Sequence, residues 1–415
     1  MKELTVDEHA AGRRLDKFLF GCLPGAPVSL VYAQLRKKNI TLNGSRATGR
    51  ESLETGDRIQ CFFSDATWEK FAAGAPITPA SVPNQANDKA DSTCGESYHT
   101  NDSGSIDKGA FLACYHAHPE VRILWEDWNI LIAEKPVGLL SQKAYKHDES
   151  LCEWVIGYLL ERGEITDQTL VQFKPAACHR LDRNTGGIVV CAKTLSAART
   201  ISQLLKERRL NKYYLALVHG RIEQGGITTA SFSRDAALNR TQIIRLPEAF
   251  VSDTKPPENS AEATDGTDAH DPATRREASK TAVTAYEPVC HYPPELLREH
   301  GFSPMAKNGE LTLVCAHLIT GRTHQLRAQF ADLSHPLVGD RKYGGPLTEK
   351  DRQIYGCKWQ MLHAGAIVFP DGSETALPEA LRGRTIISFP EHPVWQRFLT
   401  DLSADDLHAA INRLS

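Results

Sequence analysis

The run from His179 to Gly187 contains the residues of this sequence whose types and spacing best suit chemistry. It places Asp182 between two arginines, Arg180 and Arg183, and adjacent positive charge favours the ionised form of a carboxylate. An ionised aspartate can act as a nucleophile. The alternative is a structural ion pair, because most charges in such runs are solvated or structural.

A turn and a buried strand are expected directly after the aspartate. The tetrapeptide Asn184-Thr185-Gly186-Gly187 is typical of a turn, and the apolar run 188–192 predicts a strand. Asp182 is therefore expected on a loop that leads into a rigid element, where catalytic side chains are commonly held. This position favours a catalytic role over the structural one.

Three motifs, in this order, closely resemble those of the RluA family of pseudouridine synthases. They are HRLDRNTGGIVVCAKT at 179–194, KYYLALVHG at 212–220 and LITGRTHQLR at 318–327. Smaller matches surround them: Trp125-Glu126-Asp127, Glu134 to Gly138, His335-Pro336, Gly339-Asp340, Tyr343-Gly344 and Leu362-His363-Ala364. The resemblance covers about residues 120 to 400. It departs from the family at Gly186, where many relatives carry serine.

The resemblance implies a role for each of five residues. Asp182 would attack the anomeric carbon of ribose, or assist elimination to a glycal, and the sequence leaves both routes open. Arg322 would pair with Asp182, although an RNA phosphate is an alternative partner. Tyr214 would stack on the target uracil and help remove the proton at carbon five. Arg180 would fill the gap left by the flipped uridine, and Leu326 would pack near the base.

Tyr214 and the residues beside the aspartate motif have structural alternatives. A lone tyrosine in an apolar strand is more often part of the core, and the motif register favours Tyr214 over its neighbour Tyr213, which alternates to the opposite face. His179 could act as a general base, but a hydrogen-bonded structural imidazole is favoured. Cys178 and Cys191 flank the aspartate motif and are expected to behave as small apolar side chains.

Three histidines in and after the third motif could suggest a metal site, but their spacing does not favour one. His324, His335 and His363 lack the spacing of a zinc site. Gln325 and Arg327, which surround His324, better suit contacts with phosphate or base, so these three residues are predicted to bind RNA. No metal is expected. No cofactor is expected either, because the sequence has neither a phosphate-binding loop nor a dinucleotide fingerprint.

Bulk properties indicate a reduced, cytoplasmic protein with two folded units. The chain has 415 residues, 41% of them hydrophobic, which allows a substantial core in more than one domain. Neither an opening apolar segment nor a stretch long enough for a membrane span is present in the sequence. Ten cysteines without a Cys-x-x-Cys pair match neither a disulfide framework nor a zinc site. We therefore expect a cytoplasmic location, no membrane partner and no disulfide-linked partner.

The distribution of charge points to RNA despite a net charge of −3. Between Ala11 and Gln60 nine Lys or Arg residues stand against four acids. The run Leu35–Gly44, LRKKNITLNG, resembles a small RNA-binding module shared with a small-subunit ribosomal protein. The basic residues predicted to bind RNA there are Arg36, Lys37, Lys38 and Arg46. A solvated basic helix followed by an ordinary hairpin is the alternative.

Local patterns predict a helix-helix-strand order for this module. Leu15, Phe18 and Leu19 share a helical face, and Ser29 could cap a second helix. A strand is expected at 40–42, a tight Asn43-Gly44 turn after it, and a further strand at 58–63.

The predicted domains are an RNA-binding domain at 1–66, a flexible linker at 67–117 and a catalytic domain at 118–403. A polar insertion is expected at about 252–279. The catalytic part alternates strands and helices, which predicts an α+β fold; the resemblance implies a mixed sheet split by a positively charged cleft. The predicted strands are 130–133, 188–192, 214–218, 282–286 and 311–315, and the predicted helices are 152–162, 197–209 and 323–331.

These features predict an RNA pseudouridine synthase that acts by base flipping, most often on large-subunit ribosomal RNA in relatives with this domain order. Transfer RNA is the alternative substrate. A catalytically inactive RNA-binding or ribosome-assembly protein is the alternative of another class. The expected partner is RNA, and we expect a monomer.

Overall fold

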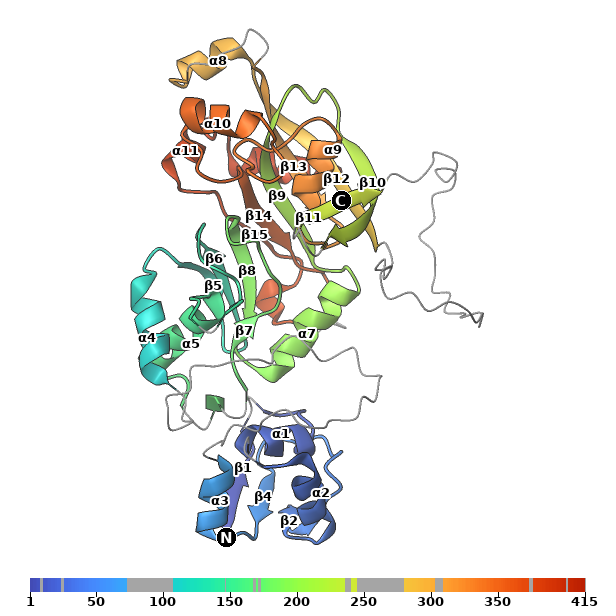
Figure 1. Cartoon of the computed structure of the whole chain (residues 1–415). Helices are drawn as coiled ribbons and strands as arrows, with labels where there is room; N and C mark the ends of the chain where they lie inside the picture. The colour runs from blue at the N-terminus through green and yellow to red at the C-terminus, as the bar shows by residue number, and fades with distance from the viewer. Residues whose placement is uncertain are drawn as a thin grey trace, which may run out of the picture. The chain divides into compact units, whose positions relative to one another are not determined.

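The computed structural model describes residues 1–7, 10–23, 26–72, 107–145, 147–166, 169–170, 173–235, 240–244, 280–302, 309–372, 376–400 and 402–414. The chain divides into two compact units (Figure 1). The first unit is Met1–Leu210 with Ala366–Phe389, and the second is Asn211–Gly365 with Pro390–Ser415.

The N-terminal module of the first unit is a small antiparallel sheet covered by helices. Its strands stand in the order β1-β4-β2-β3. The core is made by apolar side chains of α1, α2 and the strands, including Leu15, Phe18, Leu19, Leu35 and Ile59. The elements are β1 (Lys2–Thr5), α1 (Leu15–Cys22), α2 (Val28–Arg36), β2 (Ile40–Leu42), β3 (Ser45–Arg46), β4 (Arg58–Cys61) and α3 (Asp65–Ala72).

The helix-helix-strand order predicted for this module is confirmed, with one correction. Asn43 and Gly44 both have positive φ, at 50° and 75°, as a tight two-residue hairpin turn requires. Ser29 is not the cap of α2, because the helix begins one residue earlier. Pro27 holds the N-cap position, and its fixed φ suits the start of a helix.

Two helices lie inside the range predicted as linker. In α3, Trp68 and Phe71 pack against the core of the N-terminal module. In α4 (Lys108–Ala117), Phe111 and Cys114 are buried. The predicted boundaries at 67 and 117 were therefore wrong, because helices at both ends of that range pack apolar side chains against neighbouring elements. The stretch between the two helices, and the insertion predicted at about 252–279, lie outside the described residues.

The remainder of the first unit places helices against buried antiparallel strands. Every residue of β6 and β8 is buried, and α7 packs Ala197, Ile201 and Leu204 against them. In α5, a Cβ at Gly157 would lie 2.2 Å from the carbonyl oxygen of Phe111, so only glycine allows α4 and α5 to approach this closely (Figure 1). The elements are β5 (Arg122–Glu126), β6 (Ile130–Lys135), α5 (Leu151–Glu161), β7 (Ala176–Ala177), β8 (Gly186–Ala192), α7 (Leu195–Lys206), η2 (Glu379–Leu381) and β15 (Thr385–Ile387).

The second unit is built on five strands in the order β11-β10-β12-β13-β9, with antiparallel neighbours. Its strands are β9 (Asn211–His219), β10 (Gly226–Asp235), β11 (Arg240–Ile244), β12 (Lys280–Tyr292) and β13 (Leu311–Leu318), with β14 (Leu362–Val368) at the junction of the units. Its helices are α8 (Pro294–Glu299), α9 (Gln325–Asp332), α10 (Leu347–Tyr355), α11 (Pro393–Gln396) and α12 (Ala404–Leu414). The predicted α+β class is confirmed. None of the helices in the described part of the chain has the length and apolar character needed to cross a bilayer.

Candidate active site

Asp182 lies on the loop between β7 and β8, as the sequence predicted. The backbone N–H of Thr185 donates to the carbonyl oxygen of Asp182 at 3.0 Å, which closes the turn. The strand then begins at Gly186, and Gly187, opposite Lys135 in β6, has a φ of 117° that glycine adopts without strain. The turn therefore forms with glycine at position 186.

Asp182 is half-buried within its loop. Its neighbours Arg180 and Arg183 are exposed, whereas Leu181 between them is buried and anchors the loop. Asp182 is therefore partly accessible to solvent, and two exposed arginines lie within two residues of it in the sequence. This arrangement suits a group that reacts with a polyanion.

Lys135 at the end of β6 is a buried cation behind this loop, and the sequence analysis gave it no role. Its Nζ donates to the carbonyl oxygens of Pro136 and Leu139, both at 2.8 Å, and of Arg183 at 3.3 Å. Burial lowers the pKa of Lys135 to about 7, and the negative charge of Asp182 opposes that shift. The signal in the sequence that could have found it was a lysine at the end of a strand that begins with four apolar residues, 130–133.

A second side chain joins the aspartate loop to the segment after β6. The hydroxyl of Ser141 donates to the carbonyl oxygen of Leu181 at 3.1 Å and accepts the N–H of Leu181 at 2.9 Å. The N–H of Gly138 donates to the carbonyl oxygen of Arg183 at 2.8 Å. The backbone on both sides of Asp182 is thus bonded to residues 138–141, which fixes the position of the carboxylate.

The residues beside the aspartate motif have structural roles in the folded chain. Nε2 of His179 accepts the backbone N–H of Val190 at 3.2 Å, the structural imidazole that the sequence favoured over a general base. Burial raises the pKa of the Cys191 thiol well above its usual range, so it is not a nucleophile. Among the described residues, His, Cys, Asp and Glu side chains form no cluster suited to a metal ion.

Tyr214 lies in β9 of the second unit and is buried. It pairs with Ala316 of β13, while the preceding Tyr213 pairs with His317 and stacks on its ring, with 4.6 Å between centroids. Tyr213 is therefore part of the packed interior, with its ring against His317. This leaves Tyr214 as the tyrosine of the motif for the role predicted at the base.

Arg322 lies on an exposed turn before α9. Its Nε donates to the carbonyl oxygen of Thr281 at 3.3 Å, and its backbone N–H donates to the side chain of Gln325 at 3.0 Å. Tyr214 and Arg322 both belong to the second unit, and Asp182 belongs to the first. The predicted pairing of Arg322 with Asp182 therefore stays a prediction.

The other residues predicted after Arg322 are built into the second unit. Gln325 is buried, and its amide donates to Val283 O and Thr284 Oγ1, both at 2.9 Å. His324 has a left-handed φ of 55°, and its Nδ1 lies 3.2 Å from the hydroxyl of Tyr343. Gln325 thus has partners inside the protein, and we do not include it among the proposed RNA contacts.

Arg327 is also buried and forms a two-point ion pair with Asp340, with Nε–Oδ2 at 2.7 Å and Nη2–Oδ1 at 2.8 Å. The guanidinium also faces the ring of Tyr343, 5.3 Å from its centroid. Hydrogen bonds and charge from Arg327 outweigh the effect of burial and lower the pKa of Asp340. Leu326 is buried beside it. Arg327 therefore braces the helix that follows Arg322, and it too is left out of the proposed RNA contacts.

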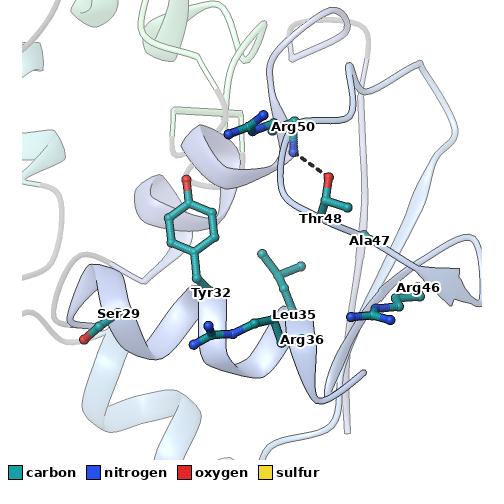
Figure 2. A pocket seen from close by; sticks show the side chains of 8 residues that line it. All are labelled: Ser29, Tyr32, Leu35, Arg36, Arg46, Ala47, Thr48 and Arg50. Carbon is teal, nitrogen blue, oxygen red and sulfur yellow. Dashed lines mark hydrogen bonds between the residues drawn. The ribbon is translucent and has the colours of Figure 1, made fainter.

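A pocket of about 420 Å³ opens in the N-terminal module (Figure 2). Figure 2 shows Tyr32 and Arg36 on α2 with Arg46 across from them. The hydroxyl of Tyr32 donates to Asp16 at 2.6 Å, which holds the ring in place. The lining residues are Ser29, Tyr32, Leu35, Arg36, Arg46, Ala47, Thr48 and Arg50. Arg36 and Arg46 thus come together, while Lys37 and Lys38 are exposed beyond the end of α2.

Comparisons with known proteins agree with the motifs. The family described as RNA pseudouridylate synthase matches residues 129–332. An uncharacterized RNA pseudouridine synthase of Mycoplasma genitalium is 27% identical over 91% of this chain and 91% of its own length. Ribosomal large subunit pseudouridine synthase C of Haemophilus influenzae is 28% identical over 90% of this chain and 89% of its own length. A solved structure, human RNA pseudouridylate synthase domain containing 4, covers 70% of this chain and 95% of that chain with 19% identity and a TM-score of 0.45.

The matched segment contains the Asp182 loop, the Tyr214 strand and the Arg322 turn, and the two relatives align over nearly the whole chain. The chain belongs to the RluA family of RNA pseudouridine synthases and is an enzyme of the isomerase class.

Proposed function

We propose that this protein converts uridine to pseudouridine in large-subunit ribosomal RNA, with Asp182 as the group that reacts at the sugar. The position of Asp182 carries the proposal: it is half-buried, flanked by exposed arginines and fixed by backbone bonds to residues 138–141. The RNA class comes from the relatives, several of which are named as large-subunit synthases.

The chemistry needs one carboxylate and no redox partner. The bond between uracil N1 and the anomeric carbon breaks, a bond from carbon five to that carbon forms, carbon five loses a proton and N1 gains one. A carboxylate can trap the electron-poor sugar carbon and leave again, as in retaining glycosidases, or assist elimination to a glycal. Both routes place the Asp182 oxygens beside the sugar.

A uridine inside an RNA helix reaches Asp182 only if it is flipped out of the stack. Arg180 is exposed beside Asp182, which suits the predicted role of filling the vacated space and offsetting part of the unstacking cost of a few kcal/mol. Tyr214 would contact the uracil, Leu326 would pack near it, His324 would contact the RNA beside it, and Arg322 would orient Asp182. These roles follow from the family resemblance and the position of each residue within its own unit.

The decisive experiment maps pseudouridine in ribosomal and transfer RNA from a strain that lacks the gene. We expect one or more positions in large-subunit ribosomal RNA to lose the modification and to regain it when the wild-type gene is returned. A loss confined to transfer RNA would move the enzyme to the alternative substrate. Unchanged RNA would favour the inactive RNA-binding protein and overturn the proposal.

We propose further that the N-terminal module binds RNA through its basic pocket. Arg36, Arg46 and Arg50 line one concave surface whose floor is formed by Leu35 and Ala47, and Lys37 and Lys38 extend the positive charge beyond α2. Guanidinium groups bind phosphate through paired N–H donors, so such a pocket suits an RNA backbone.

A triple variant, R36Q/R46Q/R50Q, tests the pocket. Each lost phosphate contact should reduce the slope of log Kd against log salt by about one, and affinity for a ribosomal RNA transcript should fall most at low salt. Nitrocellulose filter binding at four salt concentrations measures both quantities. R58Q, an exposed arginine of β4 outside the pocket, is the matched control. Equal slopes for all three proteins would show that the pocket does not bind RNA.

A further inference from the structure

The segment between β6 and α5, residues 136–150, carries two exposed apolar side chains to which the family resemblance assigned no role. Tyr145 is 78% exposed and Val137 is 38% exposed. Single exposed apolar residues are ordinary on a protein surface, so exposure alone assigns no role. The hydrogen bonds that join this segment to the Asp182 loop point to a role for the two side chains.

Tyr145 is connected to the Asp182 loop through one side chain. Oδ2 of Asp148 accepts the backbone N–H of Ala144 at 3.1 Å and of Tyr145 at 2.8 Å. Oδ1 of the same carboxylate lies 3.5 Å from Nη2 of Arg183, next to Asp182 in the sequence. The turn that presents the Tyr145 ring is therefore held on the residue adjoining the reactive carboxylate.

The base of the same segment has a second attachment. Gly138 donates to the carbonyl oxygen of Arg183, and Ser141 is bonded in both directions to Leu181. Val137 lies between these anchors and the end of β6. Two exposed apolar side chains thus lie on a segment that is bonded to the loop carrying the exposed Arg180 and Arg183. Aromatic rings next to guanidinium groups are what proteins use to hold splayed RNA bases, because every base has a face that can stack.

We propose that Tyr145 stacks on a nucleotide next to the target uridine and that Val137 packs against the same part of the RNA. The inference rests on the proposed function, since it takes the RNA at Asp182 as given. Flipping the uridine leaves its neighbours partly unstacked, and an aromatic face on the segment bonded to the Asp182 loop gives one of them a new partner. Tyr145 is then a specificity-determining contact for the RNA around the reacting base.

The test compares Y145A with wild type on unmodified large-subunit ribosomal RNA transcribed with uridine tritiated at carbon five. Release of tritium reports the isomerisation, and filter binding reports affinity. Loss of one stacked base should raise Kd about tenfold and lower kcat/KM by a similar factor. Y145W, which keeps an aromatic face, should recover most of the loss. The matched control is W128A, because Trp128 is 47% exposed in the turn at the opposite end of β6.

A photocrosslinking residue at position 145 locates the contact. We expect crosslinks to nucleotides adjacent to the modified uridine, and fewer from position 128. Wild-type Kd and kcat/KM in Y145A, or crosslinks only to other parts of the RNA or to another protein, would overturn the inference while leaving Asp182 chemistry intact. Absence of tritium release by the wild-type enzyme on ribosomal and transfer RNA would instead reject the proposed function.

Discussion

Replacement of Asp182 by asparagine is expected to abolish tritium release from labelled RNA while leaving RNA binding near the wild-type level. Asparagine keeps the size of the side chain but cannot form an ester with the sugar or supply a full negative charge. Removing a group of this kind lowers single-turnover rates by at least about 10³-fold. The exposed arginines on either side of Asp182 remain, so affinity for the polyanion should persist.

The matched control for this variant is D127N. Asp127 accepts the backbone N–H groups of Asn129 and Ile130 in the turn before β6, at the end of the strand away from Lys135. It should keep the isomerisation rate. A D182N protein with a rate near that of D127N would show that the carboxylate takes no part in the reaction.

Replacement of Lys135 by methionine is expected to produce a large loss of stability. Methionine matches the length of the side chain but leaves the carbonyl oxygens of Pro136, Leu139 and Arg183 without the Nζ donor. Such a loss costs about 2–4 kcal/mol of unfolding free energy. The rate should fall as well, because Arg183 adjoins Asp182. Urea denaturation and single-turnover tritium release measure the two effects.

Lys193 supplies a control that separates these effects. It is also buried in the first unit, and its Nζ donates to Glu126 at 2.8 Å and to Glu164 at 2.6 Å. K193M should lose a similar amount of stability, since it removes the buried cation that pairs with Glu126 and Glu164. At a temperature where both variants are folded, only K135M should be slow. Equal rates would show that Lys135 does not position the catalytic loop.

The titration of Lys135 should make the free energy of unfolding depend on pH. Burial lowers its pKa from 10.5 to about 7 in the folded chain. Between these values the unfolded chain binds more protons than the folded chain, so this group makes stability rise with pH from about 7 to about 10.5. The stability difference between wild type and K135M should therefore grow over that interval, as urea midpoints at pH 7 and pH 9 would reveal. A constant difference would contradict the shift.

Much of the fold could be predicted from apolar periodicity. The strand predicted at 188–192 is β8, the helix predicted at 152–162 is α5, and the strand predicted at 214–218 lies within β9. These elements are long and bury one face or both, so their patterns are strong. The short edge strand β1 was missed because its four residues are mostly exposed and lack a clear alternation.

Roles that depend on long-range partners could not be predicted from spacing. Gln325 and Arg327 were predicted to contact RNA from their sequence context, but nothing in that context shows the acceptors on β12 or the carboxylate of Asp340. The structural role of Lys135 could not be predicted, because the three acceptors of its Nζ come from two segments about fifty positions apart. Asp182 itself could be predicted because the residues that mark it, the flanking arginines and the turn at 184–187, adjoin it in the sequence.

The two hydrogen bonds between the Ser141 hydroxyl and the backbone of Leu181 bear on how the RNA specificity of this enzyme could change. Because those bonds fix the reactive carboxylate from the base of the 136–150 segment, substitutions at the tip can change which RNA neighbourhood is accepted without disturbing bond making at the sugar. Libraries randomised at 144, 145 and 147 should therefore yield altered target choice with undiminished turnover, making the tip a natural place to redirect the modification to new sites.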